Sequence, residues 1–211
     1  MTKQEQTVFV VDDDDPVRKS LSRLFRSAGM TVETFASAQN FLDRTHFDGN
    51  GCLVLDLNMP GLSGHDLYRE LLKADYSMPV VYLTGHGDIP TGVQAIKDGA
   101  VDFLTKPVND QQLLDAVQAA LEKDADDRRA HCATLSIRVC LSTLTAREHE
   151  VLTFVISGML NKQIAAALGI SEKTVKVHRG RVTEKLDVYS VAELVRLAET
   201  AGVLPADVSA H

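Results

Sequence analysis

Short apolar runs that end abruptly in polar residues constrain this fold more than any other feature of the sequence. The first run, Val8–Val11, leads directly into four aspartates, Asp12–Asp15. A second run, Cys52–Leu55, ends at Asp56 in the same way. Runs that are apolar at every position, without alternation, are typical of strands buried on both faces of a parallel sheet. The first part of the chain therefore reads as an α/β domain.

Segments with helical spacing of apolar residues separate these runs. The alternation of the two patterns predicts a five-stranded parallel sheet with helices on both faces. The expected strands are 8–11, 31–35, 52–55, 79–83 and 100–104. The expected helices are 17–28, 37–44, 65–74, 89–98 and one that starts at 109.

The second part of the chain shows helical signals only. Thr145 with Glu148, and Ser190 with Glu193, have the spacing of capping boxes, and each predicts a helix start. Gly169 is typical of a helix end. The expected helices of this small all-α domain are 145–157, 161–168, 171–186 and 190–200.

The charge balance supports a division into two domains. Residues 1–122 contain 10 Lys and Arg against 18 Asp and Glu, whereas residues 160–186 contain six basic residues and two acidic ones. Such asymmetry indicates modules with different partners. We expect an α/β domain over 1–122, a linker over 123–141 and a helical domain over 142–211. The linker reads either as an extension of the preceding helix or as a separate helix.

Polar residues at the ends of the predicted strands form a candidate site. In open α/β sheets, ligands bind beyond the carboxyl ends of the strands. Asp12, Asp13, Asp56 and Thr84 follow three such strands, and Lys106 follows the fifth. Taken singly, each is also typical of a turn or a helix N-cap, and only their order favours a site. Clustered carboxylates are the ligands that Mg²⁺ prefers.

The motifs VVDD, VLDLNMPG, YLTGHGD and DFLTKP together resemble the receiver domain of two-component response regulators, a flavodoxin-like fold. The resemblance implies that Asp56 accepts a phosphoryl group from a histidine kinase. It also implies a Mg²⁺ ion held by Asp12, Asp13, Asp56 and the backbone carbonyl of Asn58.

The same resemblance implies a conformational switch. Thr84 and Lys106 would contact the phosphoryl oxygens, and Phe103 would be the aromatic residue that moves when Thr84 moves. The Lys106–Pro107 peptide bond would be cis.

Residues 160–186 read as helix, turn and helix. The second helix has an apolar stripe of Val175, Val182 and Leu186, with basic residues on its other face. One buried face and one basic face suit the major groove of DNA. A solvated charged face on a helical bundle is the alternative interpretation.

The motifs LTAREHEVL, NKQIAAALGIS and TVKVH resemble the LuxR-type helix-turn-helix. With the receiver, the chain is similar to FixJ/NarL-type regulators of transcription. Two departures are Leu160, where the family usually has Ser, and Gly180, where some relatives carry a basic residue. The candidate DNA-binding residues are Asn161, Lys162, Lys173, Thr174, Lys176, Val177, Arg179, Gly180 and Arg181.

The sequence thus predicts a phosphorylation-activated, DNA-binding transcription regulator that is not an enzyme. We expect it to bind double-stranded DNA, to form a homodimer on phosphorylation, and to have RNA polymerase as a further candidate partner. Cys52, Cys132 and Cys140 lack metal-ligand spacing, which favours free thiols in the cytoplasm. No apolar run approaches the roughly 20 residues of a membrane span.

Two other functions remain open on the sequence. A Mg²⁺-dependent phosphohydrolase of the haloacid dehalogenase kind shares the Asp-tipped sheet, but its motif has an Asp where this chain has Asn58. A phosphorylation-independent DNA-binding protein would be expected to lack Asp56 or Lys106, and both are present.

Overall fold

The computed structural model describes residues 6–44, 47–74, 78–85 and 89–206. The polar start of the chain and residues 86–88 of the YLTGHGD motif lie outside the described residues. The chain divides into two compact units, residues 1–128 and 129–211. The division falls within helix α5, Asp110–Ser142. The predicted linker 123–141 is therefore helical and continues α5, which resolves the two alternatives.

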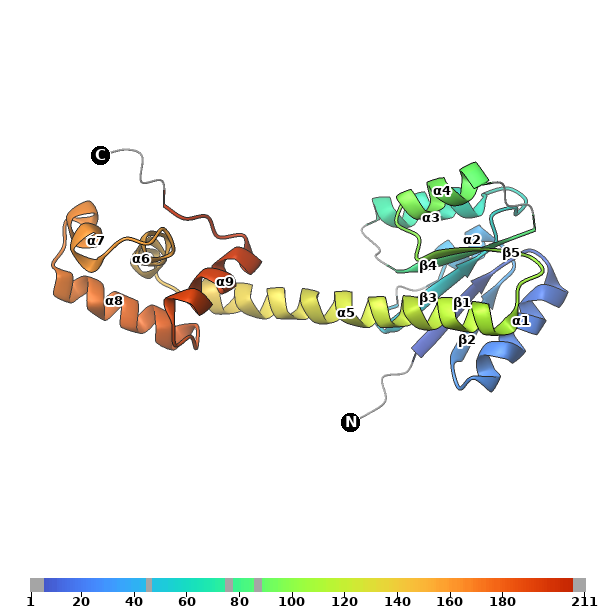
Figure 1. The fold of residues 1–211 in the computed structure, drawn as a ribbon, viewed down its shortest axis with the longest axis horizontal. Helices are drawn as coiled ribbons and strands as arrows, with labels where there is room; N and C mark the ends of the chain where they lie inside the picture. The colour runs from blue at the N-terminus through green and yellow to red at the C-terminus, as the bar shows by residue number, and fades with distance from the viewer. Residues whose placement is uncertain (1–5, 45–46, 75–77, 86–88, 207–211) are drawn as a thin grey trace. The chain divides into compact units, whose positions relative to one another are not determined.

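The first unit contains the predicted sheet. Its five strands are parallel and lie in the order β2-β1-β3-β4-β5 (Figure 1). The strands are β1 Gln6–Val11, β2 Thr31–Phe35, β3 Asn50–Leu55, β4 Val80–Thr84 and β5 Asp102–Thr105. The helices are α1 Asp15–Ser27, α2 Ala38–Leu42, α3 Gly64–Lys73, α4 Ile89–Lys97 and α5. All the predicted elements are present, with ends that differ by no more than two residues.

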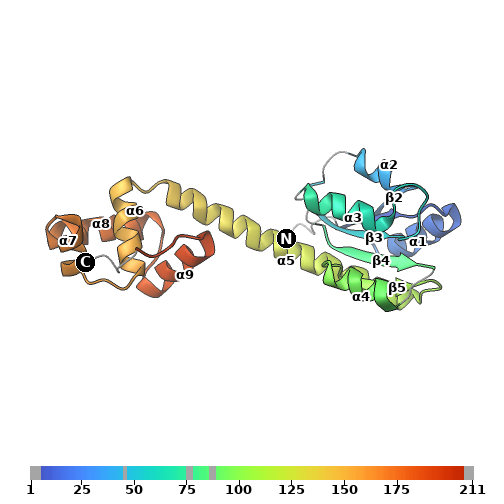
Figure 2. The same cartoon turned by 90° about the horizontal axis from the view of Figure 1, so that it is seen from above.

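Each central strand serves two hydrophobic cores. Phe9 and Val11 of β1 pack in the core beneath α2, α3 and α4. Val8 and Val10 pack in the core beneath α1 and α5. Figure 1 shows these two sets of helices on opposite faces of the sheet, and Figure 2 views the same sheet from the side of α3 and α4. The strand is apolar from Val8 to Val11 because both of its faces are covered there.

A buried acidic residue fixes α5 to the sheet. The Asp124 carboxylate is 2% exposed and accepts hydrogen bonds from the Gly51 amide at 2.9 Å and from Arg128 Nε at 2.8 Å. Arg128 Nη1 also donates to the Asp48 carbonyl at 2.8 Å. Gly51 lies 73 residues from Asp124, and Asp48 lies 80 residues from Arg128, so local sequence patterns did not predict these two bonds. The bonds hold α5 against β3 as far as Arg128.

The second unit is all-helical, as predicted. Its helices after α5 are α6 Ala146–Ile156, α7 Asn161–Leu168, α8 Glu172–Lys185 and α9 Val191–Ala201. The capping box of Thr145 and Glu148 forms. The second predicted box forms only in part, because Glu193 accepts from the Tyr189 amide, one residue before Ser190. Among the described residues, no helix has the length and apolar character needed to cross a membrane.

Candidate functional site

The ends of the strands bring the predicted acidic and basic residues together. Asp12 follows β1, Asp56 follows β3, and Lys106 follows β5. Lys106 Nζ lies 2.6 Å from Asp12 Oδ2 and 3.2 Å from Asp56 Oδ2. Asp12 is 2% exposed and Asp56 is 7% exposed, whereas Asp13 is exposed. Two buried carboxylates therefore share one ammonium group.

Three of these side chains fit a hard divalent cation. Oxygen atoms of Asp12, Asp13 and Asp56 lie within 4.8 Å of one another. Mg²⁺ is bound in proteins by oxygen ligands, usually one or two carboxylates with retained waters. The donor set of this cluster meets that requirement.

Burial and charge act against each other in this cluster. Burial is the largest influence on Asp12, and together with the nearby Asp56 it raises the pKa of that carboxyl above its usual value. Burial acts to lower the pKa of Lys106, but its bonds and charge interactions with Asp12 and Asp56 outweigh that effect and raise it. Lys106 is therefore a cation at neutral pH.

Neighbouring backbone contacts shape the pocket. Asp12 Oδ1 accepts from the Asp14 amide at 2.8 Å, and Arg18 Nη1 donates to the Asp12 carbonyl at 2.6 Å. A Cβ atom at Gly64 would lie 2.2 Å from the Asp56 carbonyl oxygen, so only glycine permits this approach of α3. Sequence patterns did not identify Arg18 or Gly64 as residues of this pocket. The small residues after VLDLNMPG were the one available signal for Gly64.

The predicted switch residues lie on neighbouring strands. Thr84 is fully buried, and its Oγ1 accepts a hydrogen bond from Asn58 Nδ2 at 3.2 Å. Phe103 is partly buried against the core beneath α3 and α4. A Cβ atom at Gly92 of α4 would lie 3.1 Å from the Phe103 ring. The Lys106–Pro107 bond is cis, as predicted.

Helix α8 has the predicted buried and exposed faces. Val175, Val182 and Leu186 are buried in the core of the helical unit. The opposite face is exposed at Lys173, Lys176, Val177, Gly180 and Arg181. Together with the start of α7, this face borders an open basin of about 570 Å³. Its lining residues are Leu160, Asn161, Lys162, Glu172, Lys176 and Arg179.

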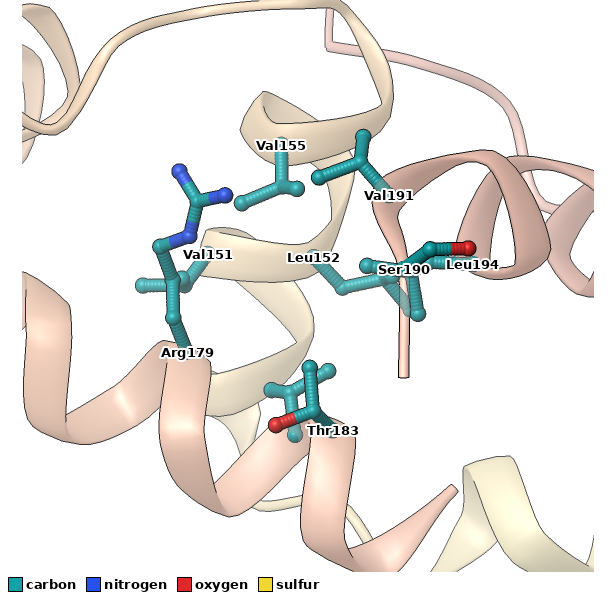
Figure 3. A pocket seen from close by; sticks show the side chains of 9 residues that line it. Val151, Leu152, Val155, Arg179, Thr183, Ser190, Val191 and Leu194 are labelled. Carbon is teal, nitrogen blue, oxygen red and sulfur yellow. The ribbon is translucent and has the colours of Figure 1, made fainter. Parts of the chain in front are cut away.

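Arg179 differs from the other basic residues of α8. It is only partly exposed, and its Nη1 donates to Asn161 Oδ1 at 2.8 Å. The side chain also lines a small, mainly apolar pocket of about 20 Å³, where it lies beside Val151 and Val155 (Figure 3). The sequence placed Arg179 among the exposed cations and did not predict this bond.

Comparisons with known proteins agree with both units. Residues 8–118 match the model of the response regulator receiver domain, and residues 142–198 match that of bacterial regulatory proteins of the luxR family. Nodulation protein W of Bradyrhizobium diazoefficiens is 48% identical over 93% of this chain and 86% of its own length. The transcriptional regulatory protein FixJ of Azorhizobium caulinodans is 44% identical over 95% of both chains.

A solved structure supports the fold. The response regulator StyR superposes with a TM-score of 0.81 and is 49% identical, covering 92% of this chain and 98% of StyR. The chain belongs to the response regulators of two-component systems, with a receiver domain and a LuxR-type DNA-binding domain, and regulates transcription in a phosphorylation-dependent way.

Proposed function

We propose that Asp56 is the phosphorylated residue and that a histidine kinase is the donor. The observation that carries this proposal is the position of Lys106 Nζ between Asp12 and Asp56. An Asp56 carboxylate oxygen would form a bond to phosphorus while the bond between phosphorus and the donor nitrogen breaks. The Lys106 ammonium group would then face the added phosphoryl oxygens, where its charge stabilises them.

Mg²⁺ is the proposed cofactor of this transfer. Asp12, Asp13, Asp56 and the carbonyl oxygen of Asn58 would hold the ion, which when bound offsets negative charge on the phosphoryl group. Thr84 and Lys106 would contact the phosphoryl oxygens. The chain would modify itself rather than turn over a separate substrate, so we propose that it is not an enzyme. Asn58, in place of a second acid, disfavours the phosphohydrolase alternative.

Phosphorylation is proposed to act through Thr84 and Phe103. Movement of Thr84 toward the phosphoryl group would release the contact between the Phe103 ring and α4. The α4–β5–α5 surface would change in consequence and form a homodimer. Two apolar residues of α4, Val93 and Ile96, are each 48% exposed, which supports an interface there. A phosphoryl group shifts this equilibrium only if it binds the two conformations with different affinity.

The helical unit is proposed to bind double-stranded DNA with α8 in the major groove. Lys176 would donate to guanine and Val177 would contact a thymine methyl group. Lys173 and Arg181 would bind phosphates and fix the register. The proposed interface also contains Asn161, Lys162, Thr174, Arg179 and Gly180.

RNA polymerase is a candidate partner, and a cytoplasmic location suits a regulator that binds DNA. Domain boundaries at 122 and 142 stay predictions, since the two compact units meet at Arg128 and Arg129.

A phosphorylation assay tests the central proposal. The full-length protein would be incubated with acetyl phosphate and Mg²⁺, and its mass measured. We expect one labile phosphoryl group, which is absent from Asp56→Asn and absent when Mg²⁺ is chelated. An equal gain in mass by Asp56→Asn would show that another residue is the acceptor.

A DNA-binding assay separates base reading from phosphate binding. Lys176→Ala should weaken binding of the preferred sequence by about 1–3 kcal/mol and relax one base position. Arg181→Ala should weaken preferred and random duplexes alike and reduce the slope of log K against log salt by about one. Full sequence preference in Lys176→Ala would exclude this face of α8 as the reader.

A further inference from the structure

Two arginines near the middle of α8 occupy different environments. Arg181 is exposed, whereas Arg179 is only partly exposed. Arg179 follows the buried Val175 by four residues and precedes the buried Val182 by three. Because residues three and four apart share one side of a helix, Arg179 emerges beside the buried face. The position of Arg179 on α8 therefore directs its side chain toward α6 and α7.

Both the aliphatic stem and the guanidinium group of Arg179 contact other parts of the helical unit. Its aliphatic part lies along the pocket bordered by Val151 and Val155 (Figure 3), a common packing mode for long basic side chains. Its guanidinium group donates to Asn161 Oδ1 at 2.8 Å. The bond joins the second helix of the helix-turn-helix to the first residue of the first helix. Arg179 thus has a defined position within the protein itself.

This bond determines which atoms of Asn161 remain available. Arginine can only donate, so the atom that faces it must be the amide oxygen. The Asn161 nitrogen Nδ2 then keeps its two donors, and within the described residues it makes no hydrogen bond. Asn161 borders the open basin that Lys162 and Lys176 also line. Two oriented donors beside cations suit an anionic oxygen.

We infer that Arg179 is a positioning residue, which holds the Asn161 amide so that Nδ2 donates to a DNA phosphate. In helix-turn-helix proteins the first helix crosses the DNA backbone, which places a phosphate near its start. Arg179 itself neutralises no phosphate, unlike Arg181. The inference rests on the proposed DNA-binding face, and it gives Arg179 a role other than a direct phosphate contact.

Arg179→Met is the most informative variant, because it keeps the apolar stem and removes the donors and the charge. Phosphorylated full-length protein would be titrated against a duplex that the wild type selects from a random-sequence pool. Fluorescence anisotropy would give the dissociation constant over a series of KCl concentrations. Asn161→Ala, the double variant and Arg181→Met complete the set, and circular dichroism melting checks that each is folded.

We expect Arg179→Met and Asn161→Ala each to weaken binding roughly 10-fold, because each loses a hydrogen bond to a charged group. The double variant should bind no worse than either single variant. The salt slope should stay at the wild-type value in Arg179→Met and fall by about one in Arg181→Met.

Three results would overturn the inference. They are a salt slope reduced by one in Arg179→Met, additive losses in the double variant, and unchanged affinity in Asn161→Asp. That last variant keeps an acceptor for Arg179 and removes both Nδ2 donors, so it also serves if Arg179→Met does not fold. Failure of the wild type to select any duplex would instead contradict the proposed DNA-binding function.

Discussion

The two units each contain a buried carboxylate paired with a lysine, and the two pairs behave in opposite ways. Asp12 lies 2.6 Å from Lys106 in the receiver, and Glu148 lies 2.6 Å from Lys185 in the helical unit. Each carboxylate residue is 2% exposed. The pKa of Asp12 is nevertheless raised above its usual value, whereas the pKa of Glu148 is lowered to about 2. Distance and exposure alone do not explain this difference.

The difference lies in what else surrounds each pair. The hydrogen bond from Lys185 is the largest influence on the Glu148 pKa, followed by the bond from the Thr145 amide, and together they outweigh burial. Lys185 also donates to the Thr143 carbonyl at 2.9 Å, and among the described residues Glu148 is the carboxylate with which it forms an ion pair. In the receiver, Asp12 and Asp56 share one lysine, and burial has the largest effect on Asp12.

The helical unit therefore uses its pair to hold α6, α8 and the end of α5 together without a ligand. The receiver pocket instead holds two buried carboxylates beside one lysine, and burial disfavours the charged form of Asp12. A carboxyl whose pKa is raised by burial in a cleft is typical of functional sites, and such sites often reduce the stability of the free protein. We therefore expect the Glu148–Lys185 pair to stabilise the fold and the Asp12–Lys106 pair to serve the proposed binding of Mg²⁺.

The largest loss of stability is expected for Glu148→Gln. The change removes the negative partner of Lys185 and leaves that ammonium group with carbonyl oxygens alone. We expect the melting temperature of the helical unit to fall by several degrees at pH 7. Hydrogen exchange measured by mass spectrometry should show faster exchange in α6 and α8 and unchanged exchange in the receiver sheet. Wild-type exchange in α6 would show that the pair does not stabilise this unit.

The stabilising effect of the Glu148–Lys185 pair should depend on pH. Because the folded pKa of Glu148 is about 2 and its ordinary value is 4.5, its contribution to stability is present above pH 4.5. It is lost as the pH falls from 4.5 toward 2. The difference in melting temperature between wild type and Glu148→Gln should therefore narrow over this range. A difference that stayed constant from pH 6 to pH 3 would contradict the assignment to this carboxylate.

At Asp12 we expect the ionised carboxylate to lower the stability of the folded protein, in contrast to Glu148. A raised pKa means that the ionised carboxylate is less favourable in the folded protein than in the unfolded chain, so it reduces stability at neutral pH. Asp12→Asn should raise the melting temperature of the metal-free receiver, because Lys106 keeps Asp56 as a partner. Added Mg²⁺ should stabilise the wild type more than the variant, since ligand binding favours the folded state. A lower melting temperature for metal-free Asp12→Asn would contradict this view of the pocket.

Sequence signals predicted the elements of both units and the residues of the receiver pocket, but not the pairing of Glu148 with Lys185. The strand β1 and the cap at Thr145 follow from neighbouring residues, so pattern and capping chemistry suffice to find them. The meeting of Asp12, Asp56 and Lys106 followed from the rule that parallel strands end at one edge of a sheet. The bond that Lys185 donates to Glu148, by contrast, joins residues 37 positions apart.

The contacts of Asp124 and Arg179 were missed for the same physical reason. The capping box accounts for the bond from Glu148 to Thr145, but no local pattern shows that Lys185 completes it. Asp124 and Arg179 lie among charged residues of helices and read as solvated until packing places partners beside them. Side chains that act across elements are set by tertiary structure, which single-sequence periodicity does not encode.

The smallest expected effect concerns Gly180. Glycine at this position makes the helical unit less stable than alanine would, as the ionised Asp12 does for the receiver. A Cβ atom at this exposed position would meet nothing within 4 Å, so the fold does not require glycine there. Gly180→Ala should stabilise the unit by about 1 kcal/mol, because glycine loses more conformational freedom in a helix. We expect weaker binding to the selected duplex, since the missing side chain would let the backbone of α8 approach the groove closely. Glu184→Ala, on the same exposed face nearer the end of α8, is the control for helix stability. If Gly180→Ala bound DNA as tightly as the wild type, the proposed close approach of α8 to the groove at this glycine would be wrong.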